Sequence, residues 1–262
     1  MTHSFLMGDS MLNIVVPMAG AGSRFAKAGY KDPKPLIPIH GVPMIKLVID
    51  NLRPTAFHRF IFICQNAHVV EYGLKEKLET WAPDSILIGI NGVTDGAACT
   101  VLKAKHYIDN NDALMIANSD QYVDVDINTY LMHMEQRRFD GIIMTMEADD
   151  PKWSFVGLSD TGIVTRVAEK EVISNDATVG IYNFARGRDF VAAAEGMIAA
   201  EERVNGEFYV APVYNQRIKL GDKIGIYSIG RDRDGMYGLG TPIDLEDFLL
   251  MSISRRAVKD AI

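Results

Sequence analysis

The sequence predicts an α/β fold: a mostly parallel β-sheet with helices on both faces and an inserted lobe of mixed or antiparallel strands. Three observations lead to this prediction. Apolar runs of strand length alternate with runs at helical spacing through the first half of the chain. These apolar runs have no polar face, as expected of strands that are covered on both sides. In the second half, several strand-like runs follow one another with only turns between them.

The first half is expected to alternate strands and helices. Leu12–Met18 is a short apolar run rich in β-branched residues, and glycines follow it directly. Pro43–Leu52 places its apolar residues at helical spacing. The other predictions here are two buried strands at Phe60–Cys64 and Ile86–Ile90, a helix at Asp95–Ile108 and a strand at Ala113–Asp120.

The second half begins with strands and continues with helices. The predicted strands are Gly141–Glu147, Phe155–Leu158, Ile163–Glu169 and Thr178–Phe184, and the predicted helices are Asp189–Arg203 and Pro212–Lys219. The last helix has a clear start, with Thr241 as its N-cap and Pro242 at its first position. No repeat or flexible linker divides the chain, so we expect one domain at 12–262 after an N-terminal extension at 1–11.

The charge balance excludes some classes of protein. Lys and Arg total 27 against 34 Asp and Glu, a formal net charge of −7. This balance argues against a dedicated nucleic-acid binder, which needs a basic surface. No apolar stretch approaches the roughly 18 residues of a membrane span, so a membrane is not an expected partner either. Cys64 and Cys99 are too few for a disulfide framework, which favours a reducing cytoplasm. The composition leaves open whether the chain forms a homo-oligomer.

A glycine-rich loop, Gly20-Ala21-Gly22-Ser23-Arg24, follows the first strand. It is not the dinucleotide fingerprint, because Phe25 stands where the third glycine is required, and no Gly-Lys-Ser/Thr follows as in a P-loop. Four basic residues against one acidic residue give the segment 24–34 a net charge of +3. Such a segment in an acidic protein indicates phosphate binding. A tight turn with solvated lysines explains the loop alone equally well.

Three stretches, the first of which contains the glycine-rich loop, resemble a known family. Pro17-Met18-Ala19-Gly20-Ala21-Gly22-Ser23-Arg24-Phe25, Pro33-Lys34-Pro35-Leu36 and Gly41-Val42-Pro43-Met44-Ile45 are similar to the start of the sugar-1-phosphate nucleotidylyltransferases, also called nucleotide-sugar pyrophosphorylases. The resemblance runs from about Asn13 to about Phe248. It implies a Rossmann-like fold and nucleotidyl transfer from a nucleoside triphosphate to a phosphorylated sugar or alcohol, with release of pyrophosphate. It also implies a nucleotide-binding half at 12–125 and an acceptor-binding half at 126–262.

The resemblance implies roles for residues of the first half. Arg24 and Lys34 are the implied catalytic residues: Arg24 holds the departing pyrophosphate, and Lys34 neutralises charge at the α-phosphate. Asp120 coordinates Mg²⁺ at the end of a buried strand. The implied nucleotide-binding residues are Ala19, Gly20, Gly22, Ser23 and Gly96, the last of them near the base.

In the second half the resemblance implies acceptor binding by Glu169, Lys170 and Gly180. The carboxylate accepts hydrogen bonds from hydroxyls, and the ammonium meets the acceptor's phosphate. The chain also departs from the family pattern. Glu171 stands where many members have proline, and Trp153-Ser154-Phe155 stands where many have an aromatic residue followed by glycine. The sequence therefore does not identify the acceptor.

A second metal-binding aspartate, which many members carry late in the chain, is absent from the stretch 207–212. Glu207 and Asn215 are the candidates to replace it. Two other functions remain open. Asp124-Val125-Asp126 has the Asp-x-Asp form of glycosyltransferases that use nucleotide sugars, although such an enzyme has no pyrophosphate for Arg24 and Lys34 to hold. A non-catalytic nucleotide-binding module is the other alternative, and the presence of both basic residues with Asp120 argues against it.

Overall fold

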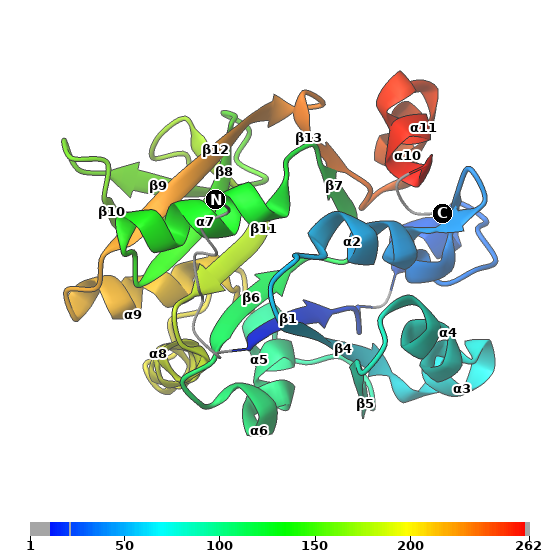
Figure 1. The fold of residues 1–262 in the computed structure, drawn as a ribbon, viewed down its shortest axis with the longest axis horizontal. Coiled ribbons are helices and arrows are strands. Elements are labelled where there is room, and N and C mark those ends of the chain that lie inside the picture. Colours follow the sequence, from blue (N-terminus) through cyan, green and yellow to red (C-terminus); the bar gives the residue numbers. More distant parts are fainter. Residues whose placement is uncertain (1–10, 21, 260–262) are drawn as a thin grey trace, which may run out of the picture.

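A computed structural model describes residues 11–20 and 22–259. Its centre is one large sheet with the strand order β5-β4-β1-β6-β11-β8-β12-β13-β7 (Figure 1). The predicted α/β fold with helices on both faces and an antiparallel insertion is confirmed. The N-terminal extension expected at 1–11 falls almost wholly outside the described residues, as does Ala21 of the glycine-rich loop.

The parallel part of the sheet is built around β1 (Leu12–Pro17). β4 (His58–Gln65) and β6 (Ala113–Ala117) pair with β1 on its two sides, and β5 (Ile86–Ile90) pairs with β4. All four predicted strands are therefore present. The expected burial of β5 is wrong, because it is the edge strand and its residues are half-buried or exposed.

Side chains of these strands alternate between two apolar clusters, one on each face of the sheet. Ile14 belongs to the first cluster and Val15 to the second, and the neighbouring strands alternate in the same way. The first face is covered by α2 (Met44–Leu52), α4 (Leu74–Trp81) and α7 (Ile127–Arg137). The second is covered by α8 (Gly187–Ala199), α9 (Tyr214–Lys219) and the short helices that follow β5.

The second half adds antiparallel strands, as predicted. β11 (Asp176–Phe184) pairs with β6 and with β8 (Gly141–Glu147), and both pairs are antiparallel. β9 (Ser154–Leu158) and β10 (Val164–Glu169) form a hairpin that joins the sheet through β11. Three strands of the large sheet were not predicted: β7 (Gln121–Val123), β12 (Ile224–Asp232) and β13 (Gly235–Gly238).

Several predicted elements have different bounds. The helix expected at Asp95–Ile108 starts only at Ala97 and is three short pieces, α5 (Ala97–Val101), η2 (Leu102–Ala104) and α6 (Lys105–Ile108). The strand expected to reach Asp120 ends at Ala117, so residues 118–120 are a loop. α10 (Pro242–Leu250) begins as predicted, with a 3.2 Å hydrogen bond from the Asp244 amide to the Thr241 hydroxyl, but α11 (Ser252–Lys259) follows it. The remaining elements are α1 (Ser23–Lys27), η1 (Lys34–Leu36), β2 (Pro38–Ile39), β3 (Val42–Pro43), α3 (Asn66–Tyr72) and η3 (Ala211–Val213).

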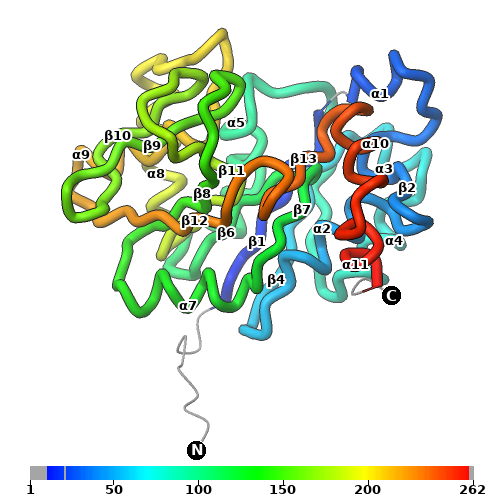
Figure 2. Tube along the Cα trace, turned by 90° about the horizontal axis from the view of Figure 1, so that it is seen from above, coloured from blue at the N-terminus to red at the C-terminus, as the bar shows by residue number. Residues whose placement is uncertain are grey.

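A third apolar cluster joins the start and the end of the described chain. Phe25 and Ile37 pack with Tyr122, Tyr237 and Phe248, which come from β7, β13 and α10. Figure 2 shows α10 and α11 beside α2 and near the α1 segment. This cluster places the basic segment 24–34 next to β7 and β13.

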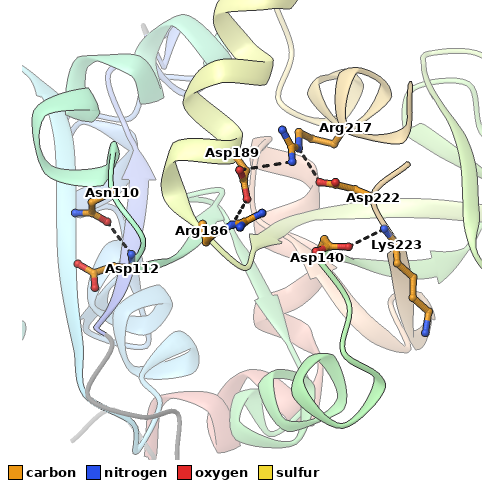
Figure 3. Close-up of polar contacts among 8 residues, drawn as sticks. All are labelled: Asn110, Asp112, Asp140, Arg186, Asp189, Arg217, Asp222 and Lys223. Carbon is orange, nitrogen blue, oxygen red and sulfur yellow. Dashed lines mark hydrogen bonds and ion pairs between the residues drawn. The ribbon is translucent and has the colours of Figure 1, made fainter. Parts of the chain in front are cut away.

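A network of charged side chains lies at the amino ends of β8 and β12 (Figure 3). Arg217 lies 3.5 Å from Asp189 and 2.7 Å from Asp222. Arg186 lies 2.6 Å from the other oxygen of Asp189. The Lys223 amide donates a 2.9 Å hydrogen bond to Asp140. The network therefore ties α8 and α9 to the amino ends of β8 and β12.

Replacing Arg217 by Met should destabilise the fold by about 3–5 kcal/mol, because it leaves Asp222 unpaired and takes one of two cations from Asp189, in a site where the three side chains are only 10–16% exposed. The matched control is Arg231→Met, which breaks an exposed pair with Glu147 and should change the free energy of unfolding by less than about 1 kcal/mol. Urea denaturation measures both. Equal losses in the two variants would contradict a buried role for the network.

Candidate functional site

The carboxyl ends of β1 and β6 form the crevice where open α/β sheets bind ligands. From β1 the chain passes through α2 to β4 on one side, whereas β6 lies on the other side of β1. The loops that leave the two strands therefore separate here. A cavity of about 400 Å³ opens at this point, and its walls come mainly from residues 17–35 and 118–120.

The glycine-rich loop lines the cavity through Gly20 and Gly22. Gly22 is the N-cap of α1 and has a φ of 59°, a left-handed conformation that favours glycine. The side-chain amide of Gln65, the last residue of β4, donates a 2.8 Å hydrogen bond to the carbonyl of Ala19, which ties the loop to the sheet. Ser23 and Arg24 are exposed on α1 beside the cavity and do not line it.

An ion pair spans the cavity between Lys34 and Asp120. Lys34 Nζ lies 2.7 Å from Asp120 Oδ2, and each side chain is 24% exposed. Lys34 begins η1 directly after Pro33, which has an extended backbone. A Cβ on Gly22 would lie 3.7 Å from the Lys34 Cβ, so the glycine-rich loop and Lys34 are in close contact. The structure thus brings together four of the predicted residues: Gly20, Gly22, Lys34 and Asp120.

Asp120 also contacts Leu239 and Gly240, which the sequence did not reveal as part of the site. The Leu239 amide donates a 2.8 Å hydrogen bond to the Asp120 carbonyl. A Cβ on Gly240 would lie 2.8 Å from Asp120 Oδ2, so a larger residue there would displace the carboxylate. The sequence offers one signal for this contact, the glycine before Thr241 and Pro242. That glycine can be assigned to the site only once the pairing of β13 with β7 is known.

Gly180 connects the second half of the chain to this cavity. Its carbonyl accepts a 3.0 Å hydrogen bond from the amide of Asn118, a residue of the cavity wall. Its φ is 82°, and a Cβ would lie only 2.1 Å from Asn118 Nδ2. Gly180 sits where the pairing of β11 with β8 shifts register, between Thr178 and Tyr182. The predicted acceptor residue therefore touches the predicted nucleotide side.

Gly96 has a structural reason to be glycine. A Cβ there would lie 2.5 Å from the carbonyl oxygen of Phe208, and its φ is 119°. The Ala98 amide donates a 3.0 Å hydrogen bond to the same oxygen. Close packing of the start of α5 on residue 208 accounts for this glycine, and binding of a base at Gly96 stays a prediction.

Glu169 and Lys170 lie at the end of β10, and no contact of the described residues joins them to the cavity. Ser154 donates a hydrogen bond to Glu169, and burial raises the pKa of this carboxyl. Lys170 donates a 2.7 Å hydrogen bond to the Tyr209 hydroxyl, which raises the pKa of the ammonium. The same ammonium lies 4.8 Å from the centre of the Tyr209 ring. Lys170 has a φ of 56°, so the chain turns sharply after Glu169.

The donor set near the cavity suits a metal that keeps most of its waters. Among residues 11–20 and 22–259, no three His, Cys, Asp or Glu side chains gather around a common point. Two carboxylate residues, Asp32 and Asp120, line the cavity, and Mg²⁺ is commonly held by one or two carboxylates with substrate phosphates. Asn215 is not a second ligand, because both amide atoms bind the Val167 backbone at 2.8 Å. Glu207 is exposed, and its ligand role stays a prediction.

The carboxylates of Asp124 and Asp126 are both used by the fold. Asp126 caps α7 and accepts hydrogen bonds from the Asn128 amide and the Thr129 hydroxyl, each at 3.0 Å. Asp124 lies 2.5 Å from the Arg256 guanidinium on α11. This arrangement explains the Asp-x-Asp spacing without a metal.

The two cysteines lie in different surroundings. Cys64 is buried in β4, and burial raises the pKa of its thiol to about 12, which suits a core residue. Cys99 is also free. Through the described ranges, no helix has the length and apolar character that crossing a membrane requires.

Comparison with known proteins decides the family. The family model for nucleotidyl transferases matches residues 14–207, which covers the cavity, Lys34, Asp120, Glu169 and Gly180. The chain belongs to the nucleotidyl transferase family. The resemblance seen in the glycine-rich loop and the Pro-Lys-Pro segment is therefore confirmed at the level of the family.

Individual relatives are distant. The chain is 25% identical over 178 residues to the bifunctional protein GlmU of Methanocaldococcus jannaschii, with 66% of this chain and 40% of that protein covered. The nucleoside-diphosphate-sugar pyrophosphorylase of Vibrio cholerae RC9 has a similar structure, with a TM-score of 0.75, 29% identity, and coverage of 91% of this chain and 100% of that one. The inositol-1-phosphate CTP transferase of T. maritima shares the fold at 14% identity, with a TM-score of 0.73 and 96% of each chain covered.

The raised pKa of Glu169 predicts how stability depends on pH. Below the ordinary glutamate pKa of about 4.3 the side chain is protonated in both the folded and the unfolded protein, and its burial has no ionic cost. As the pH rises through the raised folded pKa, the unfolded state ionises first and the fold loses stability. Glu169→Gln removes this loss, so the gain in Tm over the parent protein should be larger at pH 7 than at pH 4. Calorimetry on both proteins measures it, and a gain that shrinks toward pH 7 would contradict the burial of this carboxylate.

Proposed function

We propose that this protein transfers a nucleotidyl group from a nucleoside triphosphate to a phosphorylated sugar or a related phosphorylated alcohol and releases pyrophosphate. The observation that carries the proposal is the Lys34–Asp120 pair across a cavity that the glycine-rich loop lines. Membership of the nucleotidyl transferase family supports it. The name of the Vibrio cholerae structure supports a phosphorylated sugar as one acceptor class.

In the proposed reaction, an oxygen of the acceptor's phosphate attacks the α-phosphorus of the triphosphate, and the bond to the β-phosphate breaks. Most of the work in such a step is positioning and neutralisation of charge. The backbone at Gly20 and Gly22 is open toward the cavity and approaches the triphosphate closely. Lys34 neutralises charge at the α-phosphate. Arg24, exposed on α1 beside Gly22, has no carboxylate partner among the described residues and holds the departing pyrophosphate.

Asp120 is the proposed ligand of Mg²⁺, which supplies charge neutralisation between the phosphates when it is bound. Asp120 Oδ2 pairs with Lys34 at 2.7 Å. The carboxylate is 24% exposed and therefore open to an incoming ion. Asp120 would hold the ion through its carboxylate, and Lys34 would lie beside the same carboxylate, so the two would supply positive charge at one wall of the cavity.

In this proposal each half of the chain binds one of the two substrates. Residues 12–125 bind the triphosphate, and residues 126–262 of the same domain bind the acceptor through Glu169, Lys170 and Gly180. The contact of Gly180 with Asn118 supports this division, because it brings the second half against the cavity wall. The two free cysteines support a reducing compartment, the cytoplasm, as the place of action.

A glycosyltransferase is the weaker alternative. Its metal would need the Asp124-Val125-Asp126 stretch, and both carboxylates are engaged with α7 and with Arg256. A non-catalytic module is also disfavoured, because Lys34 and Asp120 meet at the cavity. The experiment that tests the proposed function is a pyrophosphate-release assay with Mg²⁺, each of five nucleoside triphosphates (ATP, CTP, GTP, UTP and dTTP), and a panel of phosphorylated sugars and alcohols. No release with any pair would refute it.

Lys34→Ala should lower kcat/KM for the triphosphate by more than about tenfold, the effect of one lost charge-assisted contact. The matched control is Lys27→Ala, since Lys27 is exposed on α1 and does not line the cavity. That variant should stay within about twofold of the parent. Steady-state kinetics at saturating acceptor measure both, and circular dichroism checks that both fold. A folded Lys34→Ala protein with unchanged kcat/KM would refute the role of Lys34.

Asp120→Asn should raise the Mg²⁺ concentration needed for half-maximal rate and lower kcat, because the amide keeps the shape of the side chain and removes its charge. A titration of Mg²⁺ at saturating substrates measures the change. Near-normal kcat and an unchanged requirement for Mg²⁺ would show that Asp120 is only a turn residue that pairs with Lys34.

Lys170→Ala should raise the KM of the acceptor several-fold and leave binding of the triphosphate unchanged. Lys170 lies in the second half, and no contact of the described residues joins it to the cavity. Lys152→Ala is a matched control, because Lys152 also lies 4.8 Å from the centre of an aromatic ring, that of Trp153. Kinetics give the acceptor KM, and calorimetry without acceptor gives triphosphate affinity. Weaker triphosphate binding with an unchanged acceptor KM would overturn the division into two halves.

A further inference from the structure

A row of polar side chains crosses the antiparallel part of the sheet and ends at Glu169. Glu169 on β10 pairs with Ser154 on β9, and Thr178 on β11 pairs with Thr145 on β8. Phe155 on β9 pairs with Ala177 on β11, which places Ser154 directly beside Thr178. Neighbours in such a row point to the same face of a sheet. The row therefore runs without a break from Glu169 into the interior.

The row is buried within an apolar cluster. Ser154 is 8% exposed, Thr178 3% and Thr145 0%. The residues on the same face of β9 and β10 are apolar, such as Val156 and Val167. Hydroxyl groups in such a place need hydrogen-bond partners, and Thr145 Oγ1 has none among the described residues. Apolar packing alone does not explain why this row is polar.

Hydrogen bonds within the row lead toward the carboxylate. An ionised carboxylate only accepts, so Ser154 donates its single proton to Glu169 Oε2. The Tyr182 hydroxyl lies 2.9 Å from the Thr178 hydroxyl. Burial raises the pKa of Tyr182, whereas hydrogen bonds with Thr178 and Ser154 lower it. Tyr182 therefore stays protonated, and the single proton of Ser154 is committed to Glu169.

Ser154 holds one oxygen of Glu169, Oε2, in this way, and the other oxygen, Oε1, is left without a hydrogen-bond donor among the described residues. The charged and titratable groups that face Glu169 are Lys170 beside it, Glu207 on the segment before η3, and Tyr182 on β11. None of them donates to the carboxylate. A half-buried carboxylate with one free oxygen, held by the neutral hydroxyl of Ser154, is suited to accept a hydrogen bond from a neutral hydroxyl group of a ligand.

We propose that Ser154 is a positioning residue, which holds one oxygen of Glu169 so that the other accepts a hydrogen bond from a hydroxyl group on the acceptor. The proposal rests on the proposed function and narrows the acceptor to polyol phosphates, either sugar or cyclitol phosphates. It also gives Ser154 a purpose at the position where the sequence departs from the family pattern. The β11 bulge that brings Gly180 to the cavity wall carries Thr178 and Tyr182 at its two ends.

Ser154→Ala tests the proposal, with Tyr214→Phe as the control for loss of a buried hydroxyl. Tyr214 is buried as well, but its hydroxyl donates to the Asn183 carbonyl at 2.8 Å and takes no part in the row. The probes are glucose 1-phosphate and inositol 1-phosphate, each with the five nucleoside triphosphates and Mg²⁺. Ser154→Ala should raise the acceptor KM about fivefold to tenfold, the effect of one lost hydrogen bond, with little change in kcat. Tyr214→Phe should leave the acceptor KM unchanged.

The pH profile separates positioning from a merely structural role. Without the Ser154 hydroxyl the ionised carboxylate loses a donor, so the acidic limb of kcat/KM for the acceptor should move to higher pH in Ser154→Ala. Tyr214→Phe should keep the parent profile. Ser154→Thr, which retains a hydroxyl, should restore the profile. Active variants that fold and keep the parent's KM and acidic limb would overturn the proposal while leaving the proposed function intact.

A second measurement needs no turnover. Carbon NMR of protein labelled at the glutamate side-chain carboxyls, with Glu169→Gln for assignment, gives the pKa of Glu169 directly. Ser154→Ala should raise that pKa and Tyr214→Phe should not. An unchanged pKa in Ser154→Ala would overturn the proposal even if no acceptor were found. Absence of pyrophosphate release by the parent protein, together with a raised pKa in Ser154→Ala, would refute the proposed function and uphold the hydrogen bonding of the row.

Discussion

The burial of β1 on both faces and along both edges is the constraint on which the rest of the structure depends. Its side chains enter both apolar clusters, and its backbone pairs with β4 and β6. A strand enclosed in this way can meet solvent only at its ends. The turn at its carboxyl end therefore becomes the place where the sheet opens. The glycine-rich loop lies there because it follows β1, and the cavity forms beside it.

Two weaker contacts complete this site from distant parts of the chain. The third apolar cluster packs Phe25 and Ile37 against β7, β13 and α10. Burial of such side chains contributes about 1.5–3 kcal/mol each. The half-exposed pair of Lys34 and Asp120 contributes less, as expected for charges near solvent. The apolar contacts thus hold the two walls together, and the ion pair sets which charged groups meet across the cavity.

The acceptor side depends on a local irregularity of β11. The register shift between Thr178 and Tyr182 lets Gly180 press against Asn118. The same strand pairs with β9 at Ala177, which places Thr178 beside Ser154, the donor to Glu169. One strand therefore meets the cavity wall near its middle and lies beside the strand that holds the acceptor carboxylate. A regular strand would separate these two functions, because its side chains would alternate without a close approach to the loop at 118–120.

The sequence by itself determined the alternation of strands and helices, the glycine-rich loop after β1 and the N-cap at Thr241, because apolar periodicity, glycine conformation and capping act over a few residues. It also indicated Lys34 and Asp120, but only as members of a family motif. Tertiary structure alone decided that these two meet, that Gly96 packs on Phe208, that Asn215 binds Val167, and that Ser154 stands between Glu169 and Thr178. Each of those contacts joins strands or loops far apart in the chain, and its geometry depends on strand register, which a local pattern does not contain.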